Sequence, residues 1–112
     1  MTFRNETLLW MLQRASAAVL ALCVVVHLAT MVYAIRGGLS AAEILGRTRG
    51  NYGWLAFYSL FVLACAVHVP IGLRAVLAEW AGWRGRGRDL ALLCVAAFLI
   101  YGGMSAVKGV FR

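Results

Sequence analysis

Apolar residues fill three long stretches of the chain, and short polar or glycine-rich segments separate these stretches. The first stretch carries no charged residue over Ala15–Ile35, a run of 21 residues. A helix needs about 20 mainly apolar residues to cross a bilayer. The pattern therefore predicts three transmembrane helices, at about residues 8–35, 54–79 and 89–108.

Composition supports an integral membrane protein of all-α fold. The hydrophobic share is 63%, with a mean hydropathy of +0.83 and one proline, whereas soluble domains are about half apolar. Three spans use most of the 112 residues, so we interpret residues 1–112 as a single membrane domain with no soluble catalytic domain. The first run is longer than a typical signal-peptide core, and two more spans follow it, which favours a span over a cleaved leader.

Caps and glycines mark where the helices begin and end. Asn5 or Thr7 can cap the first helix, which we expect to begin near Thr7. The segment 36–38, Arg-Gly-Gly, is a natural helix stop. Ser40 and Glu43 form a capping-box pattern, which predicts a short surface helix before Gly46 and Gly50.

The 11 basic residues lie almost entirely at the ends of the spans, where they can contact lipid headgroups. The net charge of +7 is therefore not interpreted as a sign of nucleic-acid binding. The segment 82–88 reads as a flexible basic loop, suited to an anionic membrane face or a docked soluble partner. With a cytoplasmic N-terminus, six basic residues lie inside: Arg4, Arg14, Arg74, Arg84, Arg86 and Arg88. Five lie outside: Arg36, Arg47, Arg49, Lys108 and Arg112. The dense cluster at 84–88 favours this orientation.

Each predicted span contains one cysteine: Cys23, Cys65 and Cys94. They form no Cys-x-x-Cys or Cys-x-x-Cys-His pattern, which argues against a zinc site, a disulfide framework and covalently attached c-type haem. We interpret them as small packing residues.

Two histidines, His27 and His68, lie inside predicted spans, where ionisable residues tend to be functional. Each is a candidate haem ligand, and for His27 the alternative is a histidine hydrogen-bonded to a neighbouring helix. His68 shares a helix face with Gly72, whose missing side chain would let a flat macrocycle approach, and Arg74 lies roughly 9 Å further along. Pro70 should kink this helix and free the carbonyl of Ala66, which an imidazole could then use as a hydrogen-bond acceptor.

The pattern His68-x-x-x-Gly72-x-Arg74, followed by an acid and an aromatic at 79 and 80, resembles the second helix of the cytochrome b membrane-anchor subunits of succinate dehydrogenase and fumarate reductase (complex II). Residues 12–16, Leu-Gln-Arg-Ala-Ser, are similar to the start of the first helix in that family. The resemblance implies that this chain is half of a six-helix, two-subunit anchor bundle and is not catalytic alone. A flavoprotein subunit would oxidise succinate, in the tricarboxylic acid cycle, and an iron–sulfur subunit docked on the anchor would pass the electrons on to quinone.

The resemblance also implies roles for particular residues. His68 and His27 would ligate haem b, with Gly72 and Arg74 beside it. Four residues would contribute to the quinone site: Arg14, Ser16, Glu79 and Trp80. Family members often have aspartate and tyrosine at the last two positions, and Trp80 can donate only through its indole nitrogen. For Arg14 and Arg74 the alternative is snorkelling to headgroups.

Depth along the helices separates the two histidines. With the N-terminus inside, His27 lies roughly 18 Å from the inner rim and His68 roughly 9 Å from it, at 1.5 Å per residue. The two histidines are therefore not expected to bind the same iron. Each haem iron would then need its second axial ligand from another subunit. The family arrangement then implies one or two haems per complex, the near one held by His68 and the distal one by His27.

Two other classes of function remain open from the sequence. One is a haem b anchor of another respiratory dehydrogenase, and the other is a haem-free transporter or assembly subunit. A transporter usually carries a carboxylate within the membrane, whereas all four acidic residues here lie at span ends: Glu6, Glu43, Glu79 and Asp89. The complex II reading places the chain in a bacterial cytoplasmic (inner) membrane.

Overall fold

The computed structural model describes residues 3–112, with side chains described from Asn5 onward. These residues form four helices: α1 (Phe3–Arg36), α2 (Ala41–Thr48), α3 (Tyr52–Trp80) and α4 (Arg86–Phe111). Helices α1, α3 and α4 are long and apolar enough to cross a membrane. The predicted all-α membrane fold with three spans is confirmed. Arg4, counted above among the inner basic residues, lies outside the described side chains.

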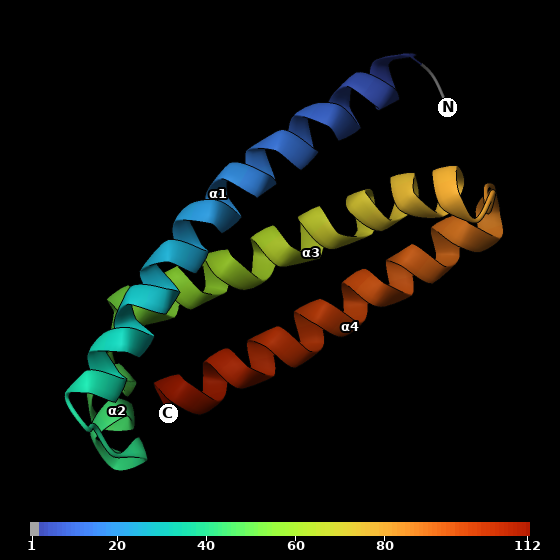
Figure 1. The fold of residues 1–112 in the computed structure, drawn as a ribbon. Helices are drawn as coiled ribbons and strands as arrows, with labels where there is room; N and C mark the ends of the chain where they lie inside the picture. Colours follow the sequence, from blue (N-terminus) through green and yellow to red (C-terminus); the bar gives the residue numbers. More distant parts are fainter. Residues whose placement is uncertain (1–2) are drawn as a thin grey trace.

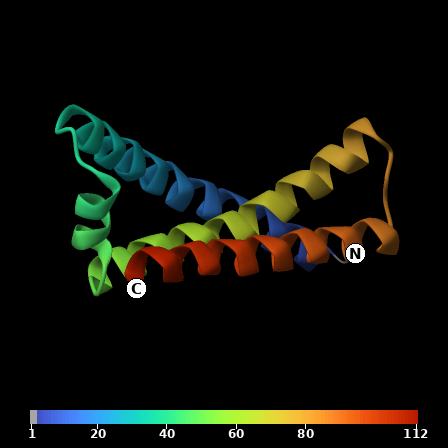
Figure 2. The same ribbon diagram turned by 90° about the horizontal axis from the view of Figure 1, so that it is seen from below.

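Helix α3 occupies the middle of the chain's fold and packs against both α1 and α4 (Figure 1). The fold is elongated, with extents of 50 × 24 × 22 Å. Seen from below, α1 crosses α3 obliquely (Figure 2). We call the end that holds the start of α1 and the α3–α4 connection the near end, and the end that holds α2 and the end of α4 the far end.

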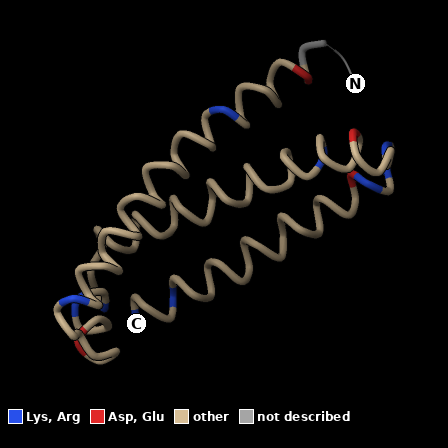
Figure 3. The backbone as a smooth tube through the Cα atoms, in the orientation of Figure 1, with Lys and Arg blue, Asp and Glu red and all other residues tan. Residues whose placement is uncertain are grey.

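Charged residues gather at these two ends, and the long middle sections of the three spanning helices carry almost none (Figure 3). Burying an unpaired charge in hydrocarbon is costly, so this distribution is the one that a bilayer requires. The near and far ends therefore correspond to the two membrane surfaces.

Glycines end α1 and α3, as the sequence predicts. Gly38 has a φ of +65° and Gly82 a φ of +64°, a conformation that side chains with a Cβ rarely adopt. The chain then turns back on the helix, because the Leu39 N–H donates to the Ala34 carbonyl at 3.0 Å. The Trp83 N–H closes the end of α3 in the same way.

Helix α2 has the predicted capping box. The Glu43 N–H donates to the Ser40 hydroxyl at 3.2 Å, and the Ser40 N–H donates to the Glu43 carboxylate at 3.3 Å. Helix α2 passes through Gly46 and ends at Thr48, before Gly50. The last turn of α2 is bonded to α4, because the Thr48 hydroxyl donates to the Val110 carbonyl at 2.8 Å.

Two helix boundaries differ from the prediction. Helix α1 already includes Asn5 and Thr7, so neither caps it at its start. Helix α4 begins at Arg86 and takes up part of the predicted loop. Arg88 is only 6% exposed, and packing of this side chain against the bundle accounts for the earlier helix start.

The buried core of this chain is small. Its apolar members are mostly compact side chains: Cys23, Ala64, Ala66, Leu92 and Val107. Many large apolar side chains are exposed along all three spans. In a bilayer protein such surface faces lipid or neighbouring subunits, so most of the apolar area of this chain is available for those contacts.

Candidate functional site

His68 lies in the middle of α3, four residues before Gly72. Its Nδ1 atom is buried and has no hydrogen-bond partner among the described residues. The ring as a whole is half-buried, so part of it is accessible from outside these helices. A ring held this way suits axial ligation, because a ligating histidine uses one nitrogen for the metal and the other as a donor.

The predicted bond from an imidazole to the Ala66 carbonyl is not formed by the buried nitrogen. Nδ1 of His27 and Nδ1 of His68 both lack a partner in the described part of the chain. Helix α3 continues through Pro70 to Trp80. The proline is therefore accommodated within the helix, and its role beside an imidazole stays a prediction.

Gly72 faces α1. A Cβ built on Gly72 would lie 3.2 Å from the amide nitrogen of the Gln13 side chain, so the space beside this glycine holds that amide. The oxygen of the same amide, Oε1, is buried and lacks a partner among the described residues. The role of Gly72 beside a haem stays a prediction.

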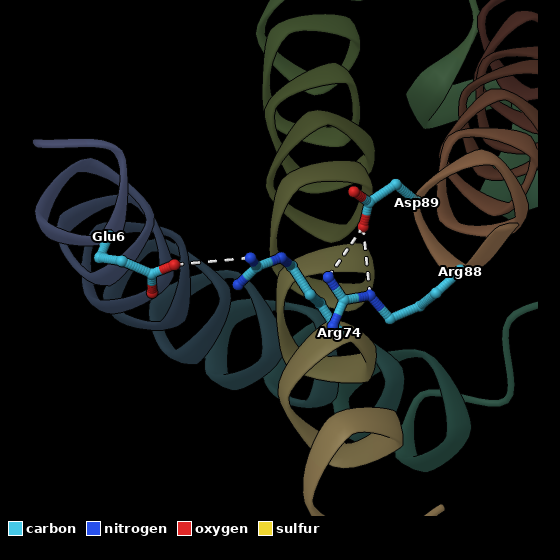
Figure 4. A network of polar contacts seen from close by, with 4 residues as sticks. All are labelled: Glu6, Arg74, Arg88 and Asp89. Atoms are coloured by element: carbon cyan, nitrogen blue, oxygen red, sulfur yellow. Dashed lines mark hydrogen bonds and ion pairs between the residues drawn. The ribbon is translucent and has the colours of Figure 1, made fainter. Parts of the chain in front are cut away.

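Arg74 reaches across to the start of α1 at the near end. Its Nη2 atom lies 3.5 Å from the Glu6 carboxylate, and Arg88 and Asp89 form a second ion pair at 3.0 Å close by (Figure 4). Arg74 also lines an apolar groove of about 440 Å³ that Asp89 borders. The near end thus combines a paired cation with a groove that runs into the apolar region.

The four residues expected at a quinone site share the near end but are not brought together. The Arg14 guanidinium lies over the Trp10 ring, 4.9 Å from its centroid. Ser16 instead points inward, 7% exposed, and its hydroxyl donates to the Gln13 carbonyl at 3.1 Å. Glu79 and Trp80 are exposed at the end of α3, with Trp80 85% exposed. Among the described residues, these four do not line a common cavity with one another.

His27 lies towards the far end, where its ring packs edge-on against Tyr58 and Phe61 with centroids 6.0 and 5.8 Å away. Two cavities of about 330 Å³ each adjoin this ring. Phe61 precedes His68 by seven residues on α3, or about 10 Å along the helix. The structure therefore keeps the two histidines at different levels, in line with the depth calculation.

The cavity on the α2 side of His27 is bordered by Arg47. Its guanidinium donates to the Tyr33 hydroxyl at 3.3 Å and lies 5.6 Å from that ring's centroid. The hydrogen bond to Tyr33 raises the pKa of Arg47 above its usual value. Arg47 was expected only to face solvent or headgroups, and the structure adds this contact with α1.

Among the described residues there is no group of three or more histidine, cysteine or acidic side chains that could hold a metal ion. A ligand set built within this chain is therefore not present in the described part. Each histidine can supply one ligand to a metal that is shared with another subunit.

Sequence reasoning missed Gln13 and Glu6 as partners of the site. Gln13 is a polar residue within the predicted span 8–35, which was a usable signal. Glu6 was placed at a span end, and its contact with Arg74 depends on the crossing of α1 over α3, which no local pattern specifies.

Comparison with known proteins gives the family. Residues 1–104 match the model of the succinate dehydrogenase/fumarate reductase transmembrane subunit. The chain is also 31% identical over 97 residues to the succinate dehydrogenase hydrophobic membrane anchor subunit of Archaeoglobus fulgidus, covering 86% of this chain and 82% of that protein. No solved structure matches the chain. With three spans, one histidine in each of two of them and a match over nearly its whole length, the chain belongs to the succinate dehydrogenase/fumarate reductase transmembrane subunit family.

Proposed function

We propose that this chain is the cytochrome b anchor of a succinate:quinone oxidoreductase. It holds the iron–sulfur and flavoprotein subunits at a bacterial cytoplasmic membrane, pairs with a second three-helix anchor subunit, ligates haem b and forms part of the quinone site. The three apolar helices and the family match support the anchor role. The large exposed apolar side chains along the spans support a second anchor subunit packed beside them.

The observation that carries haem binding is the orientation of His68. Its Nδ1 is buried and has no partner among the described residues, and the ring as a whole is half-buried, which leaves part of it open to a group outside these helices. His68 supplies one axial ligand, and the second anchor subunit supplies the other. Bound haem carries single electrons, and the chain contributes ligation, burial and hydrogen bonding, which set its potential. Arg74, at the near end of the same helix, provides a cation for the propionate side.

His27 supplies a ligand to a second, distal haem. The two cavities beside its ring support this assignment, since they give a flat group access to the imidazole. The separation from His68 by about two turns of α3 supports two haems rather than one held by both rings.

The quinone site lies at the near end. The proposed quinone residues are Arg14, Ser16, Glu79 and Trp80. Neighbouring subunits complete the pocket, since the described residues of this chain do not enclose one around these four. The groove of about 440 Å³ beside Arg74 gives the apolar tail of a quinone a path into the membrane region. Arg74 lines this groove, and an arginine side chain can donate a hydrogen bond to a quinone carbonyl.

The near end faces the cytoplasm and the iron–sulfur subunit. Arg84 and Arg86 are exposed there, and a flexible, basic connection between α3 and α4 suits an acidic protein surface or anionic lipid. This orientation places the N-terminus in the cytoplasm. The haem-free transporter is disfavoured, because the described carboxylates lie near helix ends and the family is that of an anchor.

The test is a reduced-minus-oxidised absorption spectrum of the native purified complex, with haem quantified per copy of this chain and the copurifying subunits identified. We expect His68→Ala to remove one b-type haem signal and His27→Ala to remove a different one. Leu28→Ala, an exposed neighbour of His27, is the control and should retain both.

Flavin and iron–sulfur subunits without haem would keep the anchor role and overturn both ligand assignments. One haem, lost only in His68→Ala, would give His27 a structural role. Copurification with the soluble subunits of a different dehydrogenase would overturn the succinate assignment.

A further inference from the structure

One of the two cavities beside His27 has a positive charge at its border. This cavity of about 330 Å³ is lined by His27, by mainly apolar and aromatic side chains of α1, α2 and α3, and by Arg47 of α2. Among the described residues that line it, Arg47 is the one with a permanent charge. The described lining of the other cavity contains no charged residue. The two cavities therefore differ in what they offer to an anionic group.

Two hydroxyl groups in the same lining already have acceptors within the protein. The Thr30 hydroxyl donates to the His27 carbonyl at 2.7 Å, and the Thr48 hydroxyl donates to the Val110 carbonyl at 2.8 Å. An anionic group in this cavity would therefore be bound by Arg47 rather than by these threonines.

Arg47 is held against α1. Its Nη1 donates to the Tyr33 hydroxyl at 3.3 Å, and the guanidinium lies 5.6 Å from the centroid of that ring. A guanidinium has five N–H donors, so this bond uses only one of them. Glu43, one turn earlier on α2, has its Oε1 engaged by the N–H and the hydroxyl of Ser40. Arg47 is thus oriented by a neutral partner and keeps donors for a carboxylate.

Each histidine has an arginine at a similar distance along its helix. Tyr33, which is bonded to Arg47, follows His27 by six residues on α1, or about 9 Å. Arg74 follows His68 by six residues on α3. Helices α1 and α3 run in opposite directions between the far and near ends (Figure 1). Each histidine therefore has a guanidinium displaced towards its own membrane surface.

We infer that Arg47 binds a propionate of the haem that His27 ligates, and that Tyr33 holds the guanidinium in place for it. The inference rests on the proposed ligation by His27. Haem carries two propionate carboxylates on one edge, and arginine binds carboxylates through short, often bidentate hydrogen bonds. A cation at the membrane surface lets these carboxylates stay ionised, whereas an unpaired charge within the apolar region is costly.

The charge of Arg47 has a measurable consequence for the haem. A nearby positive charge disfavours the more positive ferric state, so its removal should lower the midpoint potential. An arginine that contacts only lipid headgroups would leave the potential unchanged. The potential therefore separates propionate binding from a role at the lipid surface.

The experiment is a redox titration of the native purified complex, with the haem content of each variant measured. Arg47→Gln should lower the midpoint potential of the haem that is lost in His27→Ala and leave the haem lost in His68→Ala unchanged. Arg47→Lys keeps the charge and should retain most of the wild-type potential. Arg49→Gln removes the same charge from an exposed residue at the end of α2 that does not line the cavity, and it should shift neither haem.

Tyr33→Phe supplies a second test, should Arg47→Gln fail to assemble. It keeps the ring but removes the hydroxyl that accepts from Arg47, and it should lower the same potential by a smaller amount. A wild-type potential in Arg47→Gln, or in Tyr33→Phe where the first variant does not assemble, would overturn the inference. An equal shift in Arg49→Gln would do so too, as would loss of a copurifying anionic phospholipid with an unchanged potential.

The His27→Ala variant separates this inference from the proposed ligation. If it removes a haem whose potential does not respond to Arg47, the ligation stands and only the role of Arg47 fails. If no haem in the complex depends on His27, both fail.

Discussion

Gly103 of α4 lies directly against Val62 of α3. A Cβ at position 103 would fall 2.6 Å from Cγ1 of that valine, closer than real carbon atoms approach. Small residues let transmembrane backbones come close together, so this pair sets the spacing of α3 and α4.

Gly103→Ala should destabilise the α3–α4 contact. Overpacking of this kind costs about 1–3 kcal/mol, because Val62 or the helix must move. Thermal unfolding of the detergent-solubilised complex measures the effect. Gly102→Ala is the matched control, since nothing lies within 4 Å of a Cβ there, and equal loss in both variants would contradict the close-contact explanation.

Arg74→Ala should lower the midpoint potential of the haem that depends on His68 or weaken its retention. A nearby positive charge disfavours the more positive ferric state, so its removal makes oxidation easier. Redox titration of the purified complex gives the potential. Glu6→Gln breaks the ion pair at 3.5 Å but keeps the arginine, and it should not lower the potential. An unchanged titration in Arg74→Ala would support the alternative that this arginine only snorkels to headgroups.

Asp89→Asn should destabilise the near end. Arg88 is 6% exposed, and its Nε and Nη2 donate to one Asp89 oxygen at 3.1 and 3.0 Å. A hydrogen bond to a charged group is worth about 1.5–3 kcal/mol, and we expect the lower part of that range because Asp89 is half exposed. Arg86→Ala, an exposed neighbour, serves as the comparison. Equal unfolding midpoints for Asp89→Asn and Arg86→Ala would show that the Arg88–Asp89 ion pair does not contribute to stability.

Ser40→Ala should loosen α2. Losing an N-cap costs about 0.5–2 kcal/mol, and here the hydroxyl accepts the Glu43 N–H at 3.2 Å. Hydrogen exchange of the Glu43 amide should become faster, while amides in α3 keep their rates. Ser105→Ala removes an exposed hydroxyl from α4 and should leave α2 unaffected. Unaltered exchange at Glu43 in the Ser40 variant would refute the capping role.

The elements of the fold were predictable because each depends on a local pattern. The length of the apolar stretches predicts the spans. Gly38 and Gly82 indicate where α1 and α3 end, and Ser40 indicates where α2 begins. The boundaries that were missed depend on contacts between helices. The start of α4 takes in Arg88, whose side chain the bundle buries.

In the candidate site, too, residues that lie on one helix were predictable, and residues that come from a neighbouring helix were not. Spacing identified His68, Gly72 and Arg74, because they share one helix. It did not identify Gln13 or Glu6, which reach that helix from α1. Arg14 and Ser16, two residues apart, point in different directions from their helix, which a short motif does not reveal.

The hydrogen bonds that join the end of α2 to the end of α4 connect segments about sixty residues apart, since the Gly50 N–H also donates to the Phe111 carbonyl at 2.8 Å. A ribosome releases α2 well before α4 exists. The far end therefore cannot be completed until the third span has crossed the bilayer, whereas the packing of α1 against α3 needs no later segment. Closure of the far end thus reports that all three spans have been inserted.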